Sequence, residues 1–311
     1  MDLAFFVSIL AVTVEAGASL LYATIGEIYT ERSGILNLGL EGMMLMGAVT
    51  GFIVAKDSDS VWAGLLLAIL VGGLLGLLHA FLTITLRANQ VVCGLALTLF
   101  GTGLANFLGR SYVGLIGPKF TGIWLPVLGD IPILGEALFR QDILVYALYV
   151  LVPLAWFFLY KTRPGLHLRA VGENPQAADA LGVNVAGLRY LYTILGGMLV
   201  GLGGAHLSLA YTPGWTEGLT MGRGWIAIAL VIFATWSPAR AVVGAILFGG
   251  INAVQFRMQA AGTNIPAPFL NMLPYAATIV VLVMITWWEG FRKRIGAPAA
   301  LGLAYVREEK E

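Results

Sequence analysis

Nine long apolar segments dominate the chain and restrict what it can fold into. They cover approximately residues 4–25, 35–54, 61–86, 91–112, 143–160, 190–211, 224–236, 240–256 and 269–287. A helix needs about 20 apolar residues to cross a bilayer. The seventh and eighth segments are short and lie close together, so they form either two spans or one broken, re-entrant hairpin. The sequence predicts an all-α, polytopic transmembrane bundle of about eight to ten membrane helices, with residues 1–311 as a single transmembrane domain.

Composition supports a membrane protein and excludes several function classes. Hydrophobic residues make up 59% of the chain and charged residues only 11%, against roughly 25% charged residues in soluble domains. The net charge of +1 and the lack of a Lys/Arg run argue against nucleic-acid binding. The sequence contains no GxxxxGK[ST], HExxH or CxxC motif, and its single cysteine, Cys93, lacks metal-ligand neighbours. We therefore expect no metal site, and any ATP that drives this protein is hydrolysed by another chain.

The distribution of Lys and Arg predicts the orientation. If residues 161–189 and the tail 288–311 are cytoplasmic, twelve of the 18 basic residues lie inside and six outside, as the positive-inside rule requires. The N-terminus is then outside. Merging the two short segments into one span would reverse the predicted membrane orientation of the N-terminal half of the chain.

Three GxxxG motifs indicate close helix packing. They are Gly47–Gly51, Gly72–Gly76 and Gly197–Gly201, and small residues at this spacing let helix backbones approach one another. Because the chain has 40 glycines, we interpret these motifs as general bundle packing.

One polar stretch, RAVGENPQAADALGVN (residues 169–184), interrupts the apolar sequence. Asn174 is a favourable N-cap, Pro175 suits the first helical position, and Gly182 can end a helix in the left-handed conformation. Glu173 places a negative charge before the helix N-terminus, where it is favoured. The pattern predicts a short cytoplasmic helix whose face of Ala177, Ala178 and Ala180 could enter a groove on another protein. The alternative is a capped helix that only connects two spans.

The same stretch resembles the cytoplasmic coupling loop of ATP-binding-cassette (ABC) importer permeases, whose short helix docks into the ATPase subunit. A second stretch, GEIYTERSGILNLGLEGMMLMGAV (residues 26–49), is similar to a signature of the branch that serves simple sugars, nucleosides and branched-chain amino acids. Its matching residues are Ser33 to Gly39 and Glu41-Gly42. The segment NLGLEGMMLMGA within it looks most like the corresponding segment of nucleoside-type permeases that work with a lipoprotein receptor.

This resemblance implies a permease subunit in the bacterial or archaeal plasma membrane, with no enzymatic activity and no bound cofactor of its own. Its partners would be an ABC ATPase that hydrolyses ATP with Mg²⁺, a second identical or related permease, and an extracytoplasmic substrate-binding lipoprotein or protein. The implied coupling residues are Glu173, Asn174, Pro175, Ala177, Ala178 and Gly182. A simple-sugar permease is the nearest alternative to a nucleoside permease. An ATP-independent secondary transporter, a membrane enzyme and a structural scaffold are more distant alternatives.

Polar residues within the apolar segments are candidates for the substrate path, because ionisable and polar groups are costly in a membrane. Asn37 and Glu41 are spaced to share one helix face, and Asn252 is flanked by small residues that leave space beside it. The alternative is that Glu41 bonds to a neighbouring helix and holds the second span in place. Further candidates are Glu15, His79, Asn106, His206 and Gln255.

Overall fold

The chain forms a bundle of roughly antiparallel helices. The computed structural model describes residues 3–260, 265–289 and 296–307. The long helices are α1 (Leu3–Arg32), α2 (Leu40–Ser58), α3 (Val61–Ala80), α4 (Gln90–Gly109), α6 (Ile143–Lys161), α9 (Val185–His206), α11 (Pro238–Ala260) and α13 (Leu273–Glu289). The shorter ones are α5 (Leu134–Leu138), α7 (Arg163–Glu173), α8 (Pro175–Ala180), α10 (Arg223–Phe233) and α12 (Ala267–Asn271).

Short irregular elements extend or connect these helices. The π-helices η1 (Phe81–Thr85) and η3 (Leu207–Tyr211) continue α3 and α9, and one 3-10 turn, η2 (Arg110–Tyr112), follows α4. The strands β1 (Ile123–Trp124) and β2 (Arg140–Gln141) form one small antiparallel pair, with Ile123 opposite Gln141. Most of the described chain is helical and very little of it is strand, as the fold class predicts.

The described residues contain six helices that are long and apolar enough to cross a membrane. These are Val7–Arg32, Val61–Thr85, Gln90–Tyr112, Ile143–Lys161, Val185–Tyr211 and Pro238–Ala260. All nine predicted segments are helical over most of their described length, but three are not among the six. α2 carries Glu41, Lys56 and Asp57, α10 has only 11 residues, and α13 contributes a shorter apolar stretch. The predicted number of about eight to ten membrane helices thus includes three that are shorter or more polar than these six.

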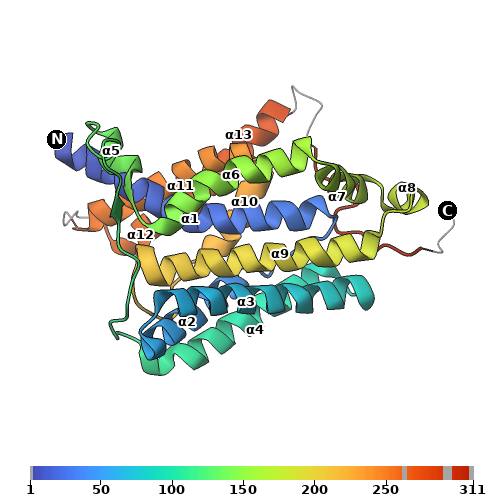
Figure 1. The fold of residues 1–311 in the computed structure, drawn as a ribbon, viewed down its shortest axis with the longest axis horizontal. Helices are drawn as coiled ribbons and strands as arrows, with labels where there is room; N and C mark the ends of the chain where they lie inside the picture. Colours follow the sequence, from blue (N-terminus) through green and yellow to red (C-terminus); the bar gives the residue numbers. More distant parts are fainter. Residues whose placement is uncertain (1–2, 261–264, 290–295, 308–311) are drawn as a thin grey trace.

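The bundle has two distinct ends (Figure 1). The N-terminus and α5 lie at one end, which we call the α5 end, and α7, α8 and the described C-terminal segment lie at the other, the α8 end. The predicted cytoplasmic segment 161–189 and the described residues 296–307 of the predicted tail therefore fall at the same end. Arg292, Lys293 and Arg294, the predicted anchoring cluster, lie outside the described residues.

The three GxxxG motifs meet at the centre of the bundle. A Cβ atom on Gly47 would lie 2.4 Å from the Gly201 carbonyl oxygen, and one on Gly72 would lie 2.3 Å from that of Gly197. These distances leave no room for a side chain, so α2 and α3 both pack backbone-to-backbone on α9. The interpretation as bundle packing is confirmed.

Two predicted helix boundaries are wrong in ways that affect the site. The first helix does not end near residue 25 but continues to Arg32, so Glu27 and Glu31 are helical and buried. The second helix begins at Leu40 rather than 35, because residues 35–39 are not helical. Asn37 and Glu41 therefore do not share a helix face.

Candidate functional site

The predicted helix in residues 169–184 is present as α8, at one end of the bundle. The Asn174 side-chain oxygen accepts a hydrogen bond from the Ala177 amide at 2.9 Å, and Pro175 occupies the first helical position. Gly182 follows the helix with φ of +81°. The capping residues therefore act as their spacing predicts.

The exposed face of α8 differs from the predicted alanine face. Ala178 is buried against Val171 and Val185, so it is part of the protein's own core. Ala177 and Ala180 are exposed, and Leu181, just after the helix, exposes 85% of its surface. An isolated, almost fully exposed leucine beside two alanines forms a small apolar projection. The sequence reasoning missed Leu181, although it is the only large apolar residue between Pro175 and Gly182.

The described part of the C-terminal tail, residues 296–307, holds α7 and α8 against the bundle; we call it the C-terminal strap. The Ala300 amide donates to the Gly172 carbonyl oxygen at 2.9 Å, and the Ala299 amide donates to Glu173 Oε2 at 3.3 Å. At the far end of the strap, Arg307 Nε lies 3.1 Å from Asp179 Oδ2 on α8. Glu173 thus binds the strap.

The strap also joins the two stretches that carry the family resemblance. The Gly302 amide donates to the Gly34 carbonyl oxygen at 3.1 Å, and Gly34 belongs to the stretch that runs from Ser33 to Gly39. In addition, a Cβ atom on Gly172 would lie 2.2 Å from the Arg32 carbonyl oxygen, so α7 contacts the end of α1 directly. A displacement of α8 would therefore reach α1 and the segment that precedes α2.

A second candidate site lies in the middle of the bundle, where two helices begin. α2 starts beside the middle of α4, because Gly42 lies against Leu97 and Thr98. α10 starts at the same point, with Gly224 against the backbone of Glu41. Since α10 has 11 residues, it is about 16 Å long at 1.5 Å per residue and covers only about half of a 30 Å hydrocarbon core. α10 is thus too short for a full span, as the predicted alternative of a broken hairpin requires, whereas α11, with 23 residues, is long enough to cross the membrane.

The Glu41 carboxylate joins these two helix starts. Its oxygens accept hydrogen bonds from Thr220 Oγ1 at 2.6 Å, from the Gly222 amide at 2.9 Å and from the Gly224 amide at 2.7 Å. The free amides at a helix N-terminus favour a negative charge, so Glu41 caps α10 from another helix. These contacts are those of the structural alternative for Glu41. A role in the substrate path stays a prediction.

A cleft leads from the α5 end of the bundle towards this junction. It has a volume of about 570 Å³ and is formed largely by residues 211–221, which connect η3 to α10. Polar and aromatic side chains line it, among them Tyr211, Thr212, Glu217 and Phe256. At its inner end, Arg223 donates to the Ala16 carbonyl oxygen at 2.9 Å and to Ser19 Oγ at 3.1 Å, and it lies over the Tyr211 ring. Arg223, which the orientation argument counts among the six outside basic residues, is thus buried.

The other two predicted path residues do not converge with Glu41. The Asn37 side-chain oxygen accepts from the Gly39 amide at 2.8 Å, which stabilises the turn before α2. Asn252 is buried on α11, where its amide nitrogen donates to the Phe248 carbonyl oxygen of the same helix. Neither residue lines the 570 Å³ cleft.

Three of the further polar candidates join separate parts of the bundle. His79 Nε2 lies 3.0 Å from the Leu36 carbonyl oxygen, and His206 Nε2 lies 3.3 Å from Asp142 Oδ2. Asn106 accepts a hydrogen bond from the Gly218 amide at 3.3 Å. Within the described ranges, no group of three or more His, Cys, Asp or Glu residues could hold a metal ion.

Buried acids near the α8 end were missed because the first span was ended too early. Glu27 Oε1 accepts from the Asn37 amide at 3.1 Å, and Glu31 accepts from the indole nitrogen of Trp236 after α10. The spacing of Glu27 and Glu31, one helical turn apart, was the available signal. Glu27 thus ties α1 to the segment that leads into α2, and Glu31 ties it to the segment that follows α10.

Comparisons with known proteins agree with the architecture. The model of the family described as "Branched-chain amino acid transport system / permease component" matches residues 8–286. A putative glucose ABC transporter permease of Haloferax volcanii is 43% identical over 98% of this chain and 99% of its own length. A nucleoside ABC transporter permease of Lactococcus lactis is 37% identical over 93% of this chain and 94% of its own length. A guanosine ABC transporter permease of Bacillus subtilis is 33% identical over the full length of both chains.

The same three organisms also contribute a second matched permease with more distant similarity. The identities are 26%, 22% and 24% for the glucose, nucleoside and guanosine permeases, over 85%, 76% and 81% of this chain.

Proposed function

The chain belongs to the branched-chain amino acid transport system permease family, and from this premise we propose that it forms half of the membrane path of an ATP-driven nucleoside importer. Membership makes it the permease subunit of an ABC transporter and a multi-pass protein of the cytoplasmic membrane. Permeases of this kind work with ATPase and substrate-binding partners. The finer proposals concern the docking helix, the second permease, the receptor and the solute.

The proposed ATPase contact is the exposed surface of α8, formed by Ala177, Ala180 and Leu181. The supporting observation is that α8 is an exposed helix fixed to α1 by the C-terminal strap. ATP binding by the partner can shift the permease between states only if α8 binds one ATPase state better than another. Glu173, Asn174, Pro175, Ala178 and Gly182 then have positioning roles, because they bind the strap, cap the helix or pack beneath it. ATP and Mg²⁺ are bound by the partner.

The proposed second subunit is a related but different permease. Supporting this, each of three organisms has one matched permease at 33–43% identity and a second at 22–26%. Co-expression of this chain with such a divergent permease from the same genome, followed by size-exclusion chromatography, tests the pairing. We expect one complex that contains both chains. Assembly of this chain with itself alone would indicate a homodimer.

A nucleoside is the proposed solute, delivered by a substrate-binding lipoprotein. Two of the three more similar relatives carry nucleoside or guanosine permease names. The 570 Å³ cleft also combines the aromatic rings of Tyr211 and Phe256 with hydroxyl and carboxylate groups, a mixture that suits a base and a ribose. The proposed path runs through this cleft to the junction at Glu41. Asn252 is retained as a candidate further along the path, and Asn37 as a residue that shapes it.

A sugar is the second candidate, since the relative at 43% identity has a glucose permease name. Uptake of radiolabelled guanosine and glucose separates the two, measured in cells that express the complete transporter and lack their own uptake systems. We expect guanosine accumulation that depends on this chain. Accumulation of glucose alone would assign the transporter to sugars, and uptake of either solute without the ATPase would contradict an ABC mechanism.

A further inference from the structure

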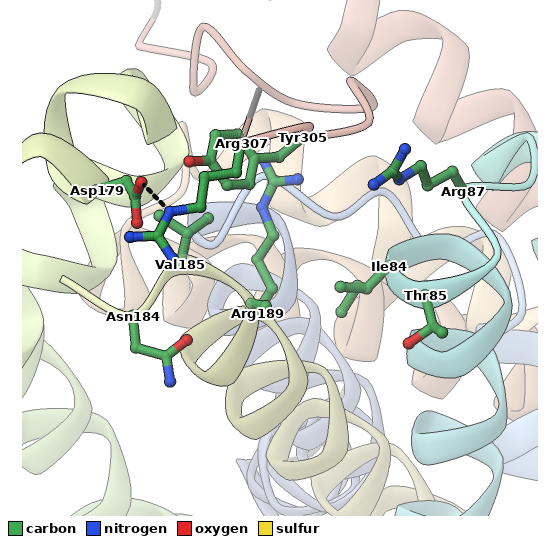
Figure 2. Close-up of a pocket in the computed structure, with 10 residues that line it drawn as sticks. Ile84, Thr85, Arg87, Asp179, Asn184, Val185, Arg189, Tyr305 and Arg307 are labelled. Carbon is green, nitrogen blue, oxygen red and sulfur yellow. Dashed lines mark hydrogen bonds and ion pairs between the residues drawn. The ribbon is translucent and has the colours of Figure 1, made fainter. Parts of the chain in front are cut away.

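A cleft at the α8 end is lined by residues that neither the docking helix nor the solute path uses. It has a volume of about 320 Å³ and lies where η1, the start of α9 and the C-terminal strap meet. Figure 2 shows side chains from these elements around one space. The charged residues that line it are Arg87, Asp179, Arg189 and Arg307.

The charge of this cleft is positive. Three arginines and one aspartate line it. The aspartate, Asp179, is paired with Arg307 at 3.1 Å, so Arg87 and Arg189 have no acidic partner among the lining residues. Two unpaired positive charges from different elements therefore lie at one cleft, which favours an anion there.

Arg189 adds a buried positive charge to the wall of the cleft. Its residue surface is only 1% exposed, although it lines the cleft. Nε donates to the Ser33 carbonyl oxygen at 3.1 Å and Nη1 to that of Leu303 at 3.2 Å, but Nη2 has no hydrogen-bond partner. Nη2 is itself buried and lies beside Gly34. Arg189 therefore attracts an anion in the cleft through its charge and not through a hydrogen bond from this nitrogen.

Arg87 lies on the opposite side of the cleft, on the turn that follows η1. Its φ of +53° is a left-handed conformation that residues other than glycine rarely adopt. Its side chain is exposed, and within the described ranges it forms no salt bridge. Arg87 is therefore available to a ligand without breaking an existing contact.

The helices that carry the cleft expose apolar side chains on their next turns towards the bundle centre. Leu77 and Phe81, on α3 and η1, are 41% and 46% exposed, and Leu191 and Leu195, on α9, are 48% and 40% exposed. The cleft thus combines an anion-binding head region with apolar surface beneath it. A soluble anion would use only the first of these features, whereas a phospholipid would use both.

We propose that this cleft binds the phosphate of an anionic glycerophospholipid, with its acyl chains along the exposed faces of α3 and α9. The charge distribution predicts that this is the cytoplasmic end, where anionic lipids concentrate. Because the strap and α8 form part of the cleft wall, the bound lipid would hold Arg307 and Asp179 in place beside the docking helix.

Native mass spectrometry of the full-length protein in detergent tests this proposal by titration with phosphatidylglycerol. Phosphatidylcholine with the same acyl chains is the zwitterionic comparison, and inorganic phosphate is the soluble competitor. The test variant is Arg87→Gln, since Arg189 also holds Ser33 and the strap and its removal could disturb the fold. Arg110→Gln, an exposed arginine at the end of α4 and outside the cleft, is the matched control.

We expect one tightly retained phosphatidylglycerol, with an affinity about fivefold lower in Arg87→Gln and unchanged in Arg110→Gln. Equal retention of phosphatidylcholine, or equal phosphatidylglycerol affinity in both variants, would overturn the proposal. Displacement of the lipid by millimolar inorganic phosphate would also overturn it, because the cleft would then belong to soluble phosphate compounds.

Discussion

Glu41 shows how an acid with two possible roles in the sequence acquires defined contacts in the structure. An acid within an apolar segment indicates either solute binding or a contact between helices. In the structure both carboxylate oxygens are occupied by donors at the start of α10. The carboxylate therefore stabilises a helix that begins inside the bundle, and its main effect should be on folding.

Replacing Glu41 with Ala should lower the free energy of unfolding by about 3 kcal/mol, because it leaves three donors at the α10 N-terminus without an acceptor. Glu41→Gln keeps an acceptor but loses the charge favoured at that position, so it should cost about 1 kcal/mol. Thermal unfolding in detergent measures both. Asn252→Ala, which removes one bond within α11, is the control and should cost less than Glu41→Ala. A fully stable Glu41→Ala protein that has lost uptake would instead support direct solute contact.

At the scale of helices, packing depends on glycines at positions of backbone contact. Gly197 and Gly103 are both helical glycines, but their surroundings differ. A Cβ atom on Gly197 would lie 2.4 Å from the Gly72 carbonyl oxygen, whereas nothing lies within 4 Å of one on Gly103. The close approach of α3 and α9 thus requires a glycine at position 197. The surroundings of α4 do not require one at position 103.

Gly197→Ala should destabilise the protein by about 1–3 kcal/mol, because two backbones must separate to admit the methyl group. Gly103→Ala should be neutral or stabilise the protein slightly, since alanine is the better helix former. The melting temperatures of the two variants provide the comparison. Equal values would contradict the backbone contact between α3 and α9.

The start of α6 depends on a carboxylate whose charge is stabilised in the folded state. Burial raises the pKa of Asp142, but the hydrogen bond to His206 and those from the Leu144 and Val145 amides outweigh burial, so that its pKa lies below the usual 3.8. A lowered folded-state pKa adds stability above the unfolded pKa of about 3.9, and this stability is lost as the pH falls through the folded value.

Asp142→Asn should therefore lower the melting temperature at pH 7, and its difference from the unmodified protein should shrink below about pH 4. Melting curves at pH 7, 5 and 3 measure this. Asp130→Asn, an exposed acid in the same connecting segment, serves as the control and should have little effect at any pH. A difference for Asp142→Asn that stays constant down to pH 3 would show that its charge does not matter.

The limits of prediction from sequence are also set at the element scale. Helices were predictable where the signal is local, as in the apolar segments and in the Asn174, Pro175 and Gly182 pattern of α8. Helix ends at Arg32 and Leu40 were not, because buried contacts with other segments satisfy Glu27 and Glu31. The burial of Ala178 depends on Val171 and Val185. The strap binds mostly through its backbone amide and carbonyl groups, which leave no residue-specific signal.

At the scale of the whole molecule, the structure connects its two ends through α1. The strap fixes α8 to the end of α1, and α1 carries Glu27, Glu31 and, near its middle, the carbonyl oxygen that binds Arg223. The Glu41 junction and the 570 Å³ cleft lie beside that middle part. This continuity provides a physical route by which a force on α8 could change the solute path.

Association with an ATPase through α8 is the central claim, and co-purification from native membranes tests it most directly. The variant is Leu181→Asp, since Leu181 is exposed and its change should not disturb the fold, whereas Ala178 is buried. Ile116→Asp is the matched control, because Ile116 is 86% exposed and belongs to the wall of the 570 Å³ cleft that opens at the α5 end. Quantitative mass spectrometry of the tagged protein gives the amount of bound ABC ATPase.

We expect the unmodified protein and Ile116→Asp to retain the ATPase in equal amounts, and Leu181→Asp to lose at least tenfold, which corresponds to about 1.4 kcal/mol. Equal ATPase recovery with Leu181→Asp would show that the α8 surface is not the contact. Recovery of this chain without any ATPase, under conditions that preserve other ABC complexes, would contradict the account as a whole.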